Sequence, residues 1–303
     1  MTKYTLKQLR YFVAVADSGN VTEASENLFI SQPAISNAIS QLEETLNTQL
    51  LIRHHAKGVS LTHAGEEMVS HCRNLLSHAE EINAQMTQHS TLISGTINFG
   101  CYASLGPIYA PKLIQGFTKL YPDINFKLFE GNIEEINEAL ISGKIEMALM
   151  YDLNNNGQIE STELAKISPH VLLSIKHPLA KRKKINLMTL QDEPLILLDL
   201  PNSSKYFQSL FEQYDKHPFI KHRTKSIEML RSLVANGEGY ALMNSKVKST
   251  TCFDGSELIS VPLADYAKPL SVVISKVSGI KLPKRCEAFL EFCIKNFNVD
   301  NNK

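Results

Sequence analysis

The stretch "SQPAISNAISQLE" (residues 31–43) has the periodicity of a helix with a proline in its first turn. Proline is tolerated there because the first N–H groups of a helix have no partner within the helix. Apolar residues recur on one side at helical spacing, at Ala34, Ile35, Ala38, Ile39 and Leu42. The other side carries small, uncharged, hydrogen-bonding side chains: Ser31, Gln32, Ser36 and Asn37. We therefore expect a short helix whose polar tip enters a groove of a partner molecule.

The residues around this stretch predict a helix–turn–helix followed by a two-stranded ribbon. Thr5 and Gln8 have the spacing of a capping box, which predicts a helix from Leu6. Asn20 and Glu23 repeat that spacing and predict a second helix. The segment "LLIRHHAKGVSLT" (residues 50–62) reads as two short strands around a loop.

A long helix is predicted from Thr62 onward. Its apolar residues alternate at spacings of four and three: Met68, Cys72, Leu75, Ala79, Ile82 and Met86. This is the seam of a coiled coil, and polar residues flank it on both sides, so we favour a dimer contact between two such helices. The alternative is that the stripe packs against its own domain. Residues 63–90 are therefore a predicted dimerisation helix, and "HSTLISGT" (residues 89–96) a hinge.

Strands then alternate with helices to the end of the chain. Residues 96–152 read as β-α-β-α-β with parallel strands, and a second similar unit follows. The last strand and helix, from residue 270, return to the first unit. We expect a domain over 94–303 made of two α/β lobes, with lobe I at 94–166 and 267–303 and lobe II at 167–266.

Composition narrows the class of protein. The 303 residues are 43% hydrophobic and 20% charged, which is typical of a globular chain with two or three modules. The chain has no apolar run of about 18 residues and no apolar N-terminal segment, so we expect neither a membrane span nor a signal peptide, and a cytoplasmic location. Five scattered cysteines without a CxxC pair favour reduced thiols and give no metal site.

Four motifs resemble the LysR-type transcriptional regulators. They are "LKQLRYFVAVADSGNVTEASENLFISQPAISNAISQLEETLNTQLLIR", "LTHAG", "FEGNIEEINEALISGKIEMAL" and "VANGEGYAL". The resemblance implies an α/β chain with an all-α winged-helix module at residues 1–62 that binds DNA. A linker helix and a periplasmic-binding-protein-like effector domain would follow. It also implies a homodimer or homotetramer on a dyad-symmetric operator, with RNA polymerase as a further partner.

The resemblance assigns the helix of residues 31–43 to DNA recognition. A helix N-terminus suits phosphate, and amide and hydroxyl groups suit base edges in the major groove. Gln32, Pro33, Ser36 and Asn37 occupy the family's base- and backbone-contacting positions, whereas Ser31 is either a contact or only a cap. Arg53 matches the wing arginine.

The sequence departs from the family pattern in its charge. Many members have a basic residue in place of Asn37 and a second wing arginine, whereas this wing carries His54, His55 and Lys57. Residues 1–62 hold five cations and five anions, so their net charge is zero: Lys3, Lys7, Arg10, Arg53 and Lys57 against Asp17, Glu23, Glu26, Glu43 and Glu44. We expect binding to lean on hydrogen bonds and to depend weakly on salt.

The effector site is predicted where strands end and helices begin, because ligands of open α/β sheets bind there. The candidate hydroxyl and amide groups are Ser104, Asn132, Asn202, Ser203 and Ser226, with Tyr102 and Tyr151 as walls. Each group alone is more often merely a helix cap. Converging from both lobes, they would suit a small organic acid, an anionic effector.

Several alternatives stay open at this point. Cys101 lies near the predicted site and would allow redox sensing if a resolving cysteine lay close. A regulator without an effector, a solute-binding protein and an enzyme of the same fold are the other candidates. The sequence shows no nucleophile–base pattern, metal spacing, GxGxxG turn or P-loop, so we expect no enzyme, cofactor or metal.

Overall fold

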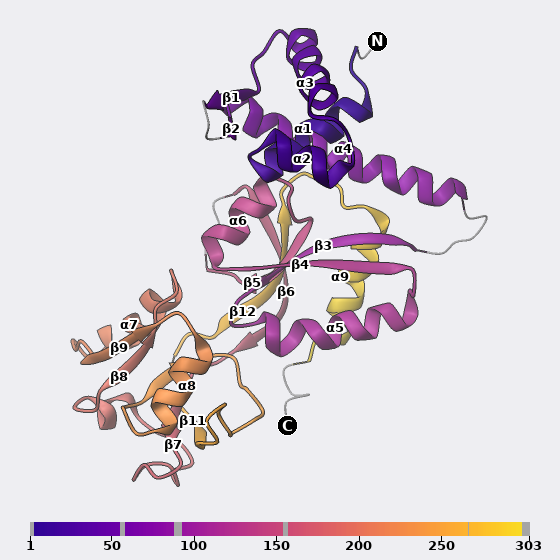
Figure 1. Cartoon of the computed structure of the whole chain (residues 1–303). Coiled ribbons are helices and arrows are strands. Elements are labelled where there is room, and N and C mark those ends of the chain that lie inside the picture. The colour runs from indigo at the N-terminus through magenta and orange to yellow at the C-terminus, as the bar shows by residue number, and fades with distance from the viewer. Residues whose placement is uncertain (1–2, 55–57, 88–92, 154–156, 266, 299–303) are drawn as a thin grey trace.

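The computed structural model describes residues 3–54, 58–87, 93–153, 157–265 and 267–298. A small N-terminal domain, a long helix and two α/β lobes follow one another along the chain (Figure 1). Among the described helices, none is both long and apolar enough to cross a membrane.

The N-terminal domain is a helix–turn–helix with a wing, as predicted. It contains α1 (Leu6–Ser18), α2 (Val21–Leu28), α3 (Gln32–Leu46), β1 (Leu51–His54) and β2 (Gly58–Leu61). The capping box of Thr5 and Gln8 starts α1, and the Asn20 side chain accepts a hydrogen bond from Thr22 N at the start of α2. The core joins the apolar sides of the three helices, and Phe12, Ile35 and Leu42 are fully buried in it.

Helix α4 (His63–Thr87) divides the predicted apolar seam into two parts. Cys72 is 1% exposed in the core of the N-terminal domain, and Met68 packs against the same core, so this part follows the alternative reading. The prediction of a continuous dimer seam is therefore wrong at Cys72, because the N-terminal domain of the same chain already covers that side chain. Further along, Leu75 is 44% and Ile82 60% exposed, and Ala79 is partly buried. The side chain of Met86 lies outside the described residues.

Lobe I is built on a five-stranded sheet of order β4-β3-β5-β12-β6. Its strands are β3 (Gly95–Tyr102), β4 (Ile124–Gly131), β5 (Met147–Tyr151), β6 (Ile159–Ile167) and β12 (Leu270–Val277). The helices are α5 (Gly106–Leu120), α6 (Ile133–Ile141) and α9 (Lys284–Asn296). The predicted β-α-β-α-β unit is confirmed, since β3 pairs in parallel with β4 and β5. The edge strand β6 was not predicted.

Lobe II contains two smaller sheets. In one, β7 (His170–Ser174) lies between β10 (Ala241–Met243) and β11 (Leu258–Pro262). In the other, β8 (Leu195–Leu198) pairs in parallel with β9 (Ile220–Thr224). The helical elements are the 3₁₀ helix η1 (Leu187–Leu190), α7 (Ser203–Glu212) and α8 (Ile227–Ala235). Strand β11 was not predicted.

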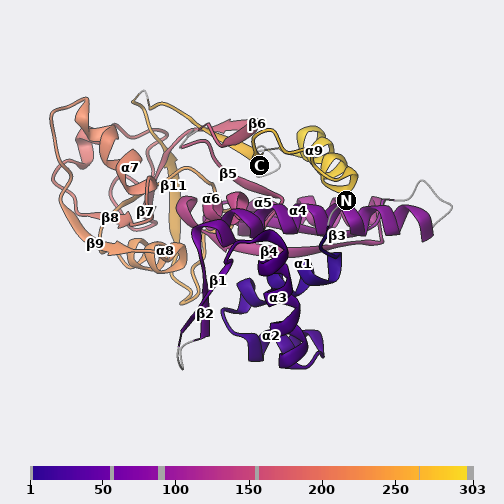
Figure 2. The ribbon, with the colours of Figure 1, turned by 90° about the horizontal axis from the view of Figure 1, so that it is seen from above.

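The lobes are joined by two crossings and share a core. The chain leaves the first sheet after Ile167 and returns to it at Leu270. One cluster of buried apolar side chains runs from lobe I into lobe II, while a second cluster lies within lobe II. Helix α4 runs alongside lobe I (Figure 2). The shared cluster therefore packs lobe I directly against lobe II.

Candidate functional site

The tip of α3 presents polar side chains outward on an apolar anchor. Ile35 and Ile39 are buried, whereas Gln32, Pro33 and Asn37 are exposed and Ser36 is partly buried. The N-cap residue Ser31 makes no side-chain capping bond; its carbonyl accepts from Ala34 N and Ile35 N instead. The Ser31 hydroxyl is exposed and remains available to a partner at the helix N-terminus.

The wing is fastened to α3 by a carboxylate. Glu43 Oε1 accepts hydrogen bonds from Leu50 N at 2.8 Å and Leu51 N at 3.0 Å, where β1 begins. Arg53, 58% exposed, donates from Nη2 to Ser40 Oγ at 3.2 Å and lies 3.9 Å from Glu43 Oε2. These contacts hold Arg53 beside α3. Sequence reasoning had counted Glu43 only as a charge.

The other wing residues are partly described. His54 Nε2 lies 2.8 Å from Ser60 Oγ, so this histidine braces the ribbon as well as pointing to solvent. His55 and Lys57 lie outside the described residues.

The second candidate site lies where the two lobes meet. Two buried side-chain pairs join them directly by hydrogen bonds: Tyr102 OH to Ser203 Oγ at 2.7 Å, and Tyr151 OH to Ser245 Oγ at 2.6 Å. All four groups are buried and follow or end strands, as predicted for the first three. Ser245 was missed, although it comes directly after the strand-like segment "YALMN".

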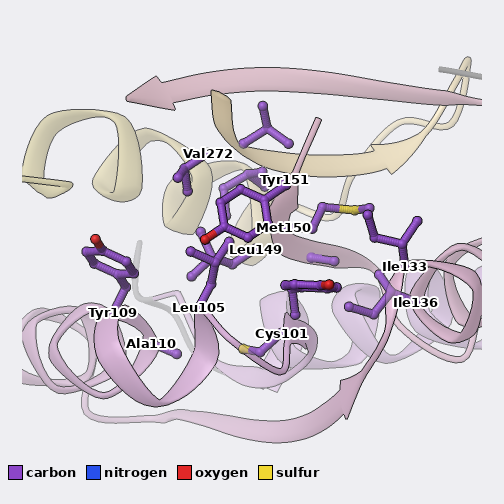
Figure 3. Close-up of a cluster of buried hydrophobic side chains, with 14 of the residues drawn as sticks. Cys101, Leu105, Tyr109, Ala110, Ile133, Ile136, Leu149, Met150, Tyr151 and Val272 are labelled. Atoms are coloured by element: carbon purple, nitrogen blue, oxygen red, sulfur yellow. The ribbon is translucent and has the colours of Figure 1, made fainter. Parts of the chain in front are cut away.

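The two tyrosines form the centre of this inter-lobe site. Their rings meet edge to face with centroids 5.4 Å apart, and the Ser104 hydroxyl also hydrogen-bonds to Tyr151. Burial raises the pKa of both phenols, so they stay neutral and can both donate and accept. Figure 3 shows Tyr151 above Leu105 and Cys101, within the apolar cluster that supports the site.

The three remaining predicted residues have different roles. Asn132 Oδ1 accepts from Glu134 N and Glu135 N, which makes it the cap of α6. Ser226 Oγ accepts from Met229 N and caps α8. For Asn132 and Ser226, the structure therefore agrees with the interpretation as helix caps. Asn202 does not cap α7 with its side chain, and its buried Nδ2 has no hydrogen-bond partner.

A matching acceptor lies after the neighbouring strand. Asn244, directly before Ser245, is buried, and its Oδ1 has no hydrogen-bond partner. Buried polar atoms of this kind are costly unless something bonds to them. Asn202 Nδ2 and Asn244 Oδ1 therefore offer one donor and one acceptor on lobe II. Sequence reasoning missed Asn244.

The Cys101 thiol is held in its less reactive, protonated form. Its side chain is buried, and burial, with Glu130 nearby, raises the pKa of its thiol to about 12. The thiolate is the reactive form of cysteine, and it is suppressed here. All five cysteines are buried and none forms a disulfide bond, and the described residues contain no cluster of three metal-ligating side chains.

Comparison with known proteins identifies both regions. The family model of the LysR substrate binding domain matches residues 90–298. The model of the bacterial regulatory helix-turn-helix protein of the lysR family matches residues 6–66.

Individual proteins agree with these matches. YvbU of Bacillus subtilis, an uncharacterized HTH-type transcriptional regulator, is 31% identical over 79% of this chain and 81% of its own length. The HTH-type transcriptional regulator BenM of Acinetobacter baylyi is 30% identical over 86% of each chain. The crystal structure of HinK, a LysR family regulator from Pseudomonas aeruginosa, covers 97% of this chain and 98% of its own, with 34% identity and a TM-score of 0.65.

These relatives are transcriptional regulators rather than enzymes, and they span nearly the same two-part architecture. The chain therefore belongs to the LysR family: it is a DNA-binding transcriptional regulator with an effector-binding domain.

Proposed function

We propose that the tip of α3 reads base edges in the major groove of a dyad-symmetric operator. Gln32, Ser36 and Asn37 supply the donors and acceptors, and Pro33 and Ser31 lie against the backbone. Arg53 and His54, together with the predicted Lys57, contact phosphate or the minor groove from the wing. The observation that supports this proposal most is that the first turns of α3 expose polar side chains while Ile35 and Ile39 of the same helix are buried in the core.

Two copies of the chain pair through α4 in this proposal. Leu75 and Ile82 are exposed at helical spacing on one side of α4, with Ala79 between them. Burying such side chains against a second α4 stabilises a dimer, by about 1.5–3 kcal/mol for each fully buried leucine or isoleucine. Two dimers then form the tetramer that the family resemblance implies. RNA polymerase and the cytoplasm remain the predicted partner and location.

The effector binds between the lobes, in contact with Tyr102, Ser104, Tyr151 and Ser203. Helices α5 and α7 begin at this edge, and hydroxyl groups with helix N-termini suit a carboxylate. A small organic acid is therefore the proposed effector class. Asn202 and Asn244 add a free donor and a free acceptor for its other polar groups.

DNase footprinting on the gene's own upstream region tests the DNA-reading part. We expect a protected dyad that disappears in Gln32→Ala and Ser36→Ala, because both side chains are accessible and neither anchors the fold. Lys205→Ala, an exposed change on α7, is the control. Protection that survives both tip substitutions would place recognition elsewhere on the domain.

A regulator without an effector is the second candidate function. It is favoured by the direct Tyr–Ser bonds, which already join the lobes. Thermal unfolding with a panel of small carboxylic acids separates the two. An effector at about 100 times its Kd adds roughly 2.7 kcal/mol of stability, whereas an effector-free regulator shows no shift with any acid in the panel.

A further inference from the structure

Helix α6 extends from the inter-lobe site to the N-terminal domain. Its N-terminus follows Gly131, whose carbonyl accepts from Ala103 N at 3.1 Å, in the segment that carries Tyr102 and Ser104. Ile133 and Ile136 of its first turns are buried in the same cluster as Tyr151, as Figure 3 shows. Nine helical residues span about 13 Å. The two ends of α6 therefore lie at two different interfaces.

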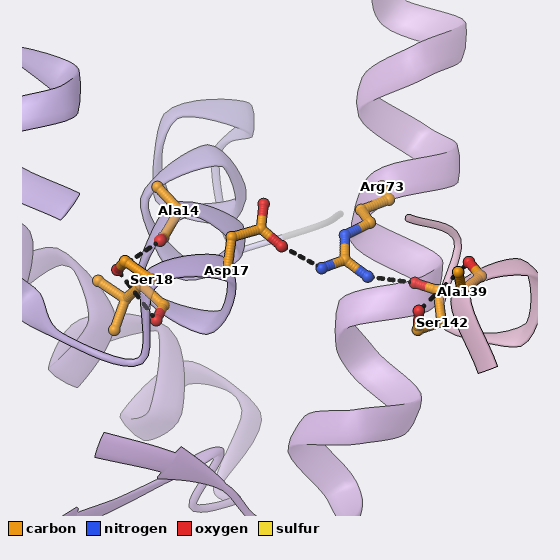
Figure 4. A network of polar contacts seen from close by, with 7 residues as sticks. Ala14, Asp17, Ser18, Arg73, Ala139 and Ser142 are labelled. Carbon is orange, nitrogen blue, oxygen red and sulfur yellow. Dashed lines mark hydrogen bonds and ion pairs between the residues drawn. The ribbon is translucent and has the colours of Figure 1, made fainter. Parts of the chain in front are cut away.

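The far end of α6 is bound by Arg73 of α4. Arg73 Nη1 donates to the carbonyl of Ser142, the C-cap residue of α6, at 2.5 Å. Its Nη2 pairs with the carboxylate of Asp17 on α1. Figure 4 shows the Arg73 guanidinium between these two partners. One side chain thus joins three elements: α6 of lobe I, the linker helix and the winged-helix domain.

The packing around Arg73 is close. Its side chain is 15% exposed, compared with 51% for Asp17, so the bond to Ser142 O is largely shielded from water. Gly143, the next residue, has a φ of +69° and lies beside α4, where an added Cβ would be 3.4 Å from Arg73 Cβ and from Ser70 O, at van der Waals distance. Because Arg73 bonds directly to the C-cap residue of α6, a displacement of this end of the helix changes the Arg73 contacts.

A second polar contact joins α4 to lobe I without involving α6. Ser77 Oγ donates to Glu146 Oε1 at 2.9 Å, and Arg285 donates to both Ser77 Oγ and Glu146. Arg285 and Glu146 are nearly buried, and Arg285 also bonds to the Thr96 carbonyl. This contact fixes α4 on β3 and α9, away from the effector edge. It provides a natural control for the route through α6.

We propose that α6 couples the inter-lobe site to the winged-helix domain and that Arg73 is the residue through which the coupling passes. The proposal rests on the proposed effector site. A change at Tyr102 and Tyr151 moves the N-terminal end of α6, the helix transmits the displacement, and Arg73 passes it to Asp17 on α1. Helix α1 packs on both α2 and α3, so its position sets that of the recognition helix.

Hydrogen exchange measured by mass spectrometry on the full chain tests this without a known effector. The double variant Tyr102→Phe/Tyr151→Phe removes both inter-lobe hydroxyl bonds and serves as the perturbation. It is combined in turn with Arg73→Ala, with Asp17→Asn and with Ser77→Ala. Asp17→Asn changes a half-exposed side chain, so it keeps the test valid if Arg73→Ala does not fold.

We expect the double variant to speed exchange in the first turn of α6 and at the end of α1, by a factor of about 5 or more. Arg73→Ala and Asp17→Asn should remove the effect on α1 and keep it on α6, whereas Ser77→Ala should preserve both. An unchanged effect on α1 without Arg73 or Asp17 would overturn the proposal. So would a perturbation that never reaches α1; the effector site itself is judged separately, by the thermal shifts of the unaltered chain.

Discussion

The tip of α3 and the inter-lobe site are built in opposite ways. At the tip, polar groups are exposed and apolar groups beneath them hold the helix. Between the lobes, polar groups are buried and bond to one another across the interface. In the proposed function, the first arrangement leaves its side chains accessible to DNA at all times. In the proposed function, the second exchanges its internal hydrogen bonds for those of an effector, which makes its occupancy conditional.

The largest effect should come from the anchor of the tip. Ile39→Ala removes a buried side chain from the N-terminal core and should lower the free energy of unfolding by about 2–5 kcal/mol. Chemical denaturation measures this. The matched change Ala34→Gly, on the exposed side of the same helix, should cost only about 1 kcal/mol. Equal losses for the two variants would show that Ile39 is not an anchor.

Acid should weaken lobe II through His170. Burial, helped by the charge of Lys246, lowers the pKa of this histidine from 6.5 to about 4. The unfolded chain therefore takes up a proton that the folded chain refuses as the pH falls from 6.5 toward 4. The contribution of His170 to the free energy of unfolding is fully present above pH 6.5. It falls by up to about 3 kcal/mol as the pH drops from 6.5 to 4.

Urea denaturation at several pH values, compared with His170→Leu, isolates the effect of His170. The decline between pH 6.5 and 4 should be smaller in the variant. An identical pH profile in His170→Leu would mean that this histidine is not held neutral.

The inter-lobe bonds should contribute less than the core but measurably. Tyr151→Phe leaves Ser245 and Ser104 without their phenol partner and should lower the free energy of unfolding by about 1–3 kcal/mol. Tyr121→Phe, on a partly buried phenol of the same lobe, is the matched control. A Tyr151→Phe protein as stable as its parent would argue that the lobes are not held together at this point.

The smallest effect concerns salt. Residues 1–62 have a net charge of zero, so few counterions should be released on binding DNA. The slope of log K against log salt concentration should be shallow, well short of about −8. Titration with KCl by fluorescence anisotropy measures it. A slope as steep as −8 would show that phosphate contacts dominate after all.

The sequence predicts the tip better than the inter-lobe site for a physical reason. Helix α3 is specified by local periodicity, by Pro33 in the first turn and by the family motif. Ser245 meets Tyr151 across a sequence separation of 94 residues, which no local pattern records. The same limit applies to Arg73, because its position in the α4 sequence pattern does not indicate that it bonds to Asp17 and Ser142.

The strands that the sequence did not predict, and the interrupted apolar stripe of α4, also depend on contacts that local sequence patterns do not record. Strand β6 is a charged edge strand with irregular alternation, and β11 is short and ends in proline. The heptad spacing of α4 is real, yet Cys72 is covered by its own domain. Periodicity indicates which face of a helix is buried but not which neighbour covers it.

One pair of measurements tests the contrast between the two sites most directly: operator affinity and unfolding free energy, each determined for Gln32→Ala and Tyr151→Phe. Gln32→Ala should lower affinity about tenfold to a hundredfold, as for a lost base contact, and leave unfolding unchanged. Tyr151→Phe should lower the unfolding free energy while the footprint on DNA keeps its position. If Gln32→Ala bound the operator as tightly as the parent while Tyr151→Phe lost the footprint, the assignment of DNA reading to the tip of α3 would be wrong.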